Sequence, residues 1–93
     1  MKCRRKPIEL ECWPVAKILT ERKECPDWVK ANFDDGLLFI DTINGDSDLR
    51  VRTREGWLTA YSDGYLIQGK EGQIWPVALV DFLAGYEPIE EPV

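Results

Sequence analysis

The segment LRVRTR carries arginine at every second position, as Arg50, Arg52 and Arg54. Successive side chains of a β-strand point to opposite faces, so this spacing predicts that the three guanidinium groups share one face, opposite Leu49 and Val51. Guanidinium groups are rigid, permanently charged donors that suit phosphates and carboxylates. The stripe therefore indicates either an anion-binding surface or a solvated face whose charges pair with aspartates across neighbouring strands.

Acidic residues gather around the apolar run LLFIDTI. Asp34 and Asp35 precede it, Asp41 lies within it, and Asp46 and Asp48 follow it. Carboxylates in such numbers can hold a divalent cation, but in loop segments they more often solvate turns, which is the interpretation favoured here. On a surface they also suit a basic partner. These five aspartates and the three arginines are the candidate partner-binding residues.

Catalytic chemistry finds little support in the sequence. The chain has no histidine, which removes the usual general base near neutral pH and the commonest metal ligand. Gly69-Lys70 lacks the spacing and the hydroxyl residue of a P-loop, and neither Ser47 nor Ser62 has a nucleophile-elbow context. Carboxylates alone can perform acid–base chemistry, which is the remaining enzymatic alternative. We expect a non-enzymatic protein without a metal or cofactor.

The three cysteines, Cys3, Cys12 and Cys25, are odd in number and show no CxxC spacing. This is typical of free thiols in a reducing compartment rather than of a zinc site. Cys12 alternates with Ile8 and Leu10, which predicts that it is a small core residue.

The first third of the chain contains one clear strand and one clear helix. Residues 8–12 alternate between apolar residues and glutamates, which predicts a half-exposed strand that stops at Pro14. Residues 15–24 are compatible with either a loop or a helical turn. In CPDWVKANFDDG, an early proline, an acidic first turn and a closing glycine predict a short helix at about residues 26–34.

From residue 37 onward, glycine-marked turns separate short apolar runs. Turns at Asn44-Gly45, Asp63-Gly64 and Lys70-Glu71 predict consecutive antiparallel hairpins across residues 37–77. The segment LVDFL predicts one helical turn before Gly85, and YEPIE predicts a last strand.

Together these elements predict one α+β domain over residues 1–93: a strongly bent antiparallel sheet of five to six strands with one short packed helix. Residues 1–7 are expected to form a basic N-terminal segment and residues 90–93 a frayed tail. The bulky residues expected to be largely buried are Trp28, Phe33, Ile67, Trp75 and Phe82.

Composition and charge narrow the class further. The chain is 44% hydrophobic and 31% charged, as in soluble globular proteins, and no apolar run is long enough to cross a membrane. Glutamates interrupt the stretch after the basic N-terminus, so we read no export signal and expect a cytoplasmic protein. Residues 1–30 hold eight basic and five acidic side chains (+3), whereas residues 31–93 hold four and twelve (−8). This predicts either two faces with different partners or an acidic surface with a short basic tail.

Both ends of the chain resemble a known group of proteins. MKCRRKPIELECW is similar to the opening of the PGDYG-type small phage and prophage proteins, and TREGWLTAYSDGYLIQGKEGQIWPVALVDFLAGYEPI is similar to their C-terminal half. In the name-giving turn Asp63 precedes Gly64 instead of following it, and residues 77–79 replace a Cys-Lys-Pro run. The resemblance implies a mobile-element context and no particular reaction. The matching residues of the second segment are Thr53, Glu55, Gly56, Tyr65, Leu66, Ile67, Gly69, Gly72, Trp75, Pro76, Phe82, Tyr86 and Glu87.

The expected function is that of a phage or prophage accessory protein that binds a host protein or ribonucleoprotein complex in the host cytoplasm. The resemblance and the acidic balance after residue 30 favour a sharper version, an inhibitor of a host defence complex of the CRISPR type that acts through an acidic surface. One alternative is a nucleic-acid or phosphate-binding module that uses the arginine stripe, which an isoelectric point near 4.7 argues against. Another is a virion accessory protein. No membrane partner is expected, and the oligomeric state is left open.

Overall fold

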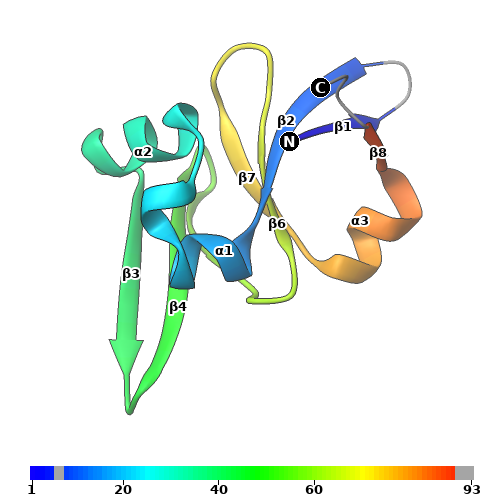
Figure 1. The fold of residues 1–93 in the computed structure, drawn as a ribbon. Coiled ribbons are helices and arrows are strands. Elements are labelled where there is room, and N and C mark those ends of the chain that lie inside the picture. Colours follow the sequence, from blue (N-terminus) through cyan, green and yellow to red (C-terminus); the bar gives the residue numbers. More distant parts are fainter. Residues whose placement is uncertain (6–7, 90–93) are drawn as a thin grey trace.

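The computed structural model describes residues 1–5 and 8–89, so the predicted frayed tail at 90–93 and part of the basic segment lie outside the described residues. The described chain forms eight strands, three α-helices and one 3-10 helix (Figure 1). In chain order they are β1 (Lys2–Arg5), β2 (Ile8–Pro14), α1 (Val15–Thr20), η1 (Arg22–Glu24), α2 (Asp27–Asp34), β3 (Leu38–Ile43), β4 (Asp46–Thr53), β5 (Gly56–Ala60), β6 (Tyr65–Gln68), β7 (Ile74–Val77), α3 (Leu79–Gly85) and β8 (Glu87–Ile89).

The strands form two antiparallel sheets, so the α+β class is correct and the prediction of a single bent sheet is wrong. A five-stranded sheet has the order β7-β6-β2-β1-β8, and a three-stranded sheet has the order β3-β4-β5. The chain leaves one sheet at Ala60 and enters the other at Tyr65, where β6 pairs with β2 and places Ile67 opposite Cys12. The predicted single sheet is divided in two because β6 pairs with β2, a strand distant in sequence. Local turn signals do not reveal such pairing.

Two of the three predicted hairpin turns are confirmed. Asn44 and Gly45 join β3 to β4 with φ angles of 53° and 83°, the positive values that a two-residue hairpin turn needs. The turn at Lys70-Glu71 joins β6 to β7.

The third predicted hairpin turn, at Asp63-Gly64, connects the two sheets instead. A Cβ atom on Gly64 would collide with the Val77 carbonyl oxygen, and the Gly64 carbonyl accepts a hydrogen bond from the Val15 N–H at 3.0 Å. This glycine permits close backbone approach between segments that come from different parts of the chain.

The helical predictions are largely confirmed, although the structure has more helix than the single one expected. α2 lies within residues 26–34, and α3 contains the predicted turn before Gly85. Residues 15–20, left open between loop and helix, form α1 because Val15 and Ile18 are on its buried side. Four of the seven residues predicted as a basic N-terminal segment form β1, which pairs with β2 and β8.

Strand β6 of the five-stranded sheet is buried on both faces. Leu66 and Ile67 are consecutive in β6 and point to opposite faces, yet both are fully buried. Leu66 belongs to a core formed with the three-stranded sheet, α1 and α2, and Ile67 packs with Cys3, Cys12 and Phe82 in a second core.

The bulky core residues were predicted in part. Ile67 and Phe82 are buried, whereas Trp28, Phe33 and Trp75 are half-buried at the margins of the two cores. None of the described helices is long and apolar enough to cross a membrane.

Candidate interaction surface

The three-stranded sheet has one face toward the first core and one toward solvent. Its register places Arg50 opposite Phe39 and Thr59, and Asp41 opposite Asp48. Directly opposed residues share a face, so Arg50 and Arg52 lie on the same face as Asp41, Asp46 and Asp48. We call it the outer face; by register it comprises Phe39, Asp41, Ile43, Asp46, Asp48, Arg50, Arg52, Trp57 and Thr59.

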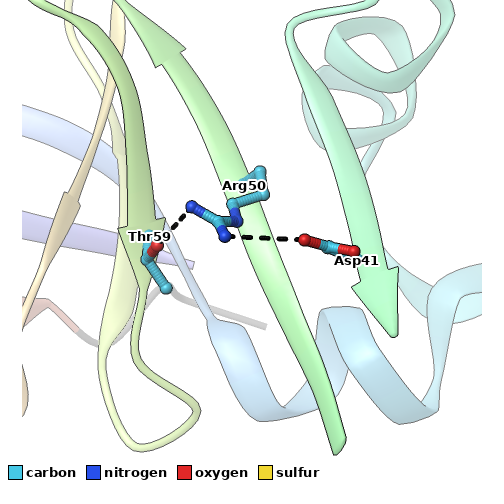
Figure 2. Close-up of polar contacts among 3 residues, drawn as sticks. All are labelled: Asp41, Arg50 and Thr59. Carbon is cyan, nitrogen blue, oxygen red and sulfur yellow. Dashed lines mark hydrogen bonds and ion pairs between the residues drawn. The ribbon is translucent and has the colours of Figure 1, made fainter. Parts of the chain in front are cut away.

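The Arg50 side chain contacts both neighbouring strands. Its Nη1 donates a hydrogen bond to Thr59 Oγ1 at 2.9 Å, and its Nη2 lies 3.5 Å from Asp41 Oδ2 (Figure 2). The Arg50 and Asp41 side chains are about one third exposed, at 33% and 32%. The guanidinium thus bridges β3 and β5 across β4, and its charge is already matched by a carboxylate.

The predicted arginine stripe is shorter than its spacing suggested. β4 ends at Thr53, so Arg54 lies in the turn to β5, where its Nη2 is 4.0 Å from Glu71 Oε2. Both of those side chains are highly exposed, and such pairs contribute little to stability. Of the three arginines, only Arg52 combines a position on the outer face with an exposed side chain and no carboxylate partner among the described residues.

An aromatic pair lies on the outer face. The rings of Phe39 and Trp57 meet edge to face with centroids 5.0 Å apart, and the Arg52 guanidinium carbon lies 5.6 Å from the Trp57 ring centroid. Phe39 is 44% exposed and Trp57 is 42% exposed. Aromatic and arginine side chains are the types that dominate binding energy at protein interfaces, so this cluster has the composition of a candidate binding surface.

Beyond Asp41 the β3–β4 hairpin projects as an arm (Figure 1). Residues 42–48 are all exposed, and the Ile43 side chain retains 56% of its accessible surface. Within the described part of the chain, Asp46 and Asp48 form no ion pair. The arm therefore carries two uncompensated carboxylates and one exposed apolar side chain.

Asp34 and Asp35 do not join this cluster. They end α2 and lie before β3, whereas Asp46 and Asp48 lie past its far end. Among the described residues no group of three potential ligands could hold a metal ion. The candidate acidic residues consequently do not form one site.

The surroundings of the three cysteines indicate a structural role. All three are buried free thiols, and burial raises the pKa of each one. Cys12 packs in the second core as its alternation predicted. A buried thiol with a raised pKa is a poor nucleophile, so these residues contribute packing rather than reactivity.

Phe39 and Trp57 were not among the residues proposed from the sequence. The signal was present, because a two-residue turn at Asn44-Gly45 fixes the register that places Phe39 beside Arg50. Comparison with protein-family models, curated proteins and solved structures finds no match for this chain. The resemblance to PGDYG-type proteins therefore stays a prediction.

Proposed function

We propose that this protein is a non-enzymatic binding protein that docks on a partner protein through the outer face. The observation that carries the proposal is the exposed Phe39–Trp57 pair, which lies beside Arg52 on the face that also carries the acidic arm. An aromatic centre with charged groups around it is the usual organisation of a protein-binding surface, where buried anchors supply energy and peripheral charges supply orientation.

A protein partner fits this face better than a nucleic acid. Arg50 is engaged by Asp41, and Arg54 is separated from the strand. Arg52 is left as the exposed cation of the face, while Asp46 and Asp48 on the same face repel phosphates. The nucleic-acid alternative is therefore not favoured by the arrangement of charges.

The biological setting of the proposal rests on the resemblance to phage and prophage proteins. In that setting the partner is a host protein or ribonucleoprotein in the host cytoplasm, and a defence complex with a basic surface is the sharper candidate. The acidic arm supports this version, whereas the position of Asp34 and Asp35 away from it does not. Binding would thus combine a short acidic contact with aromatic anchors, rather than mimic a nucleic acid over a whole face.

Affinity capture from host lysate tests the proposal, with and without nuclease. We expect a protein to be retained after nuclease treatment by the wild-type chain and lost with Phe39→Ala/Trp57→Ala, because hot-spot truncation costs about 2 kcal/mol or more, roughly 30-fold in affinity. Val80→Ala/Leu83→Ala is the matched control, since these apolar side chains are 72% and 69% exposed on α3.

The charged residues then separate the versions of the proposal. Asp46→Lys/Asp48→Lys should weaken capture if the acidic arm contributes, and Arg52→Ala should do so if the cation next to Trp57 contributes. Capture that disappears with nuclease, or that survives loss of both aromatic rings, would contradict docking of a protein on this face.

A further inference from the structure

The outer edge of β3 presents backbone groups whose direction follows from the hairpin turn. In a two-residue hairpin the flanking residues, here Ile43 and Asp46, exchange both backbone hydrogen bonds, and every second pair does the same. The hydrogen bond from the Arg52 N–H to the Leu37 carbonyl, at 2.8 Å, fits this alternation of hydrogen-bonded pairs. The backbone N–H and C=O groups of residues 37, 39, 41 and 43 therefore point toward β4. Those of Leu38, Ile40 and Thr42 point away from the sheet.

This edge lacks the features that usually prevent pairing. β3 contains no proline and no lysine, and its register with β4 runs without a bulge from Leu38 to Ile43. Within the described part of the chain, no backbone hydrogen bond reaches the outward groups of Ile40 or Thr42. In Figure 1 β3 forms a lateral border of the molecule, and its hairpin end extends away from the helices.

We propose that a second copy of this chain pairs antiparallel with β3, edge to edge, to form a two-fold dimer with a continuous six-stranded sheet. Pairing with an identical strand satisfies both edges at once, which is the property of a two-fold interface. The strand LFIDTI is itself rich in β-branched and aromatic residues, so it is well suited as the added strand. The inner row of each copy, Leu38 and Ile40, would extend that of the other.

The charge of Asp41 restricts the register in which two β3 strands can pair. Asp41 is the one charged residue of β3, and a register centred on it would place two carboxylates directly opposite each other. A register centred on Ile40 uses all three outward residues and places Asp41 beside Phe39 of the second copy. Phe39, 44% exposed in the single chain, would then lose solvent contact along the new seam.

The dimer does not rest on the proposed function, although Phe39 belongs to both surfaces: pairing extends the sheet in its own plane, covers part of Phe39 and leaves Trp57 and Arg52 accessible. The salt dependence of the affinity distinguishes self-association from binding of a basic partner. Each copy carries a net charge of −5, so self-pairing should strengthen as salt screens the repulsion between copies. Binding of a basic partner to the acidic arm should weaken under the same change.

Sedimentation over a wide concentration range, combined with amide hydrogen exchange, tests the inference. The wild-type mass should rise toward twice that of the 10.7 kDa chain, and the Ile40 and Thr42 amides should exchange more slowly at high concentration. Thr42→Pro removes an outward N–H without removing a bond to β4, so it should keep the protein monomeric.

Ser47→Pro is the matched control. Ser47 lies opposite Thr42 on β4, and Ala60, the last residue of β5, pairs with Leu49, so no ladder bond is lost. Both prolines remove the 3.1 Å contact between the Thr42 and Ser47 hydroxyls, but only Thr42→Pro blocks the β3 edge. A wild-type monomer at all concentrations, a dimer that persists in Thr42→Pro, or a dimer without protection at Ile40 would each overturn the inference. If the Ile40 and Thr42 amides were protected only after a foreign protein was added, the β3 edge would bind that protein and not a second copy of the chain.

Discussion

Truncation of Phe82 to alanine tests whether α3 covers the second core. Phe82 is 1% exposed and stacks between two tyrosine rings, with centroid distances of 3.9 Å to Tyr65 and 5.3 Å to Tyr86. Loss of a fully buried phenylalanine costs about 3–5 kcal/mol, the sum of a transfer contribution and a cavity contribution. Both stacking contacts disappear together, and each aromatic pair adds about 0.5–1.5 kcal/mol, so we expect the upper half of that range.

The assay is equilibrium unfolding in urea, monitored by tryptophan fluorescence. A domain of this size has a total stability of about 5–15 kcal/mol, so a loss in this range is a large share of it and the Phe82→Ala midpoint should fall steeply. Leu83→Ala is the control on the same helix; its side chain is 69% exposed and its substitution should change stability by about 0.5 kcal/mol or less. If Phe82→Ala lowered the free energy of unfolding by less than about 1 kcal/mol, the packing of α3 on the sheet would be refuted.

Three further expectations concern stability and thiol ionisation. Gly64→Ala should destabilise the fold, seen as a lower melting temperature, because its new Cβ would collide with the Val77 carbonyl. Arg50→Ala should cost about 1–2 kcal/mol in urea unfolding, since it removes a hydrogen bond and a partly exposed ion pair, whereas Arg52→Ala should cost about 0.5 kcal/mol or less. Because burial raises the pKa of all three thiols, the folded state retains protons that the unfolded chain releases above about pH 8.5. Unfolding free energy should therefore fall as pH rises past that value, and a triple Cys→Ala variant should show a weaker decline.

Local patterns predicted the elements better than their assembly. The hairpin at Asn44-Gly45 and the helix that ends near Asp34 each depend on a few adjacent residues, and both appear where expected. The position of β6 depends on pairing with β2, from which it is separated by about fifty residues of chain, and no turn signal encodes that choice. The predicted single sheet was wrong for this reason.

The candidate surface was also predicted in part. Alternation correctly placed Arg50 and Arg52 on one face of a strand. The register that brings Asp41 close to Arg50 follows from the Asn44-Gly45 turn and could have been predicted from the sequence. The end of β4 before Arg54 could not. Whether an aromatic residue on that face is exposed depends on the packing of the sheet, which the strand pattern alone does not determine.

The cations of the first strand are not a separate basic surface. Lys2 is directly opposite Glu11 and Arg4 is opposite Glu9 in the β1–β2 pair, so the cations of this strand lie beside carboxylates of its neighbour. Opposite charges at such positions favour the pairing of the two strands, and they reduce the long-range field of the basic segment. Among the described residues of the outer face, the charges without an ion-pair partner are Arg52 and the two carboxylates of the projecting arm, Asp46 and Asp48. Electrostatic steering of a partner should therefore originate at the arm, next to the aromatic pair that would hold that partner in place.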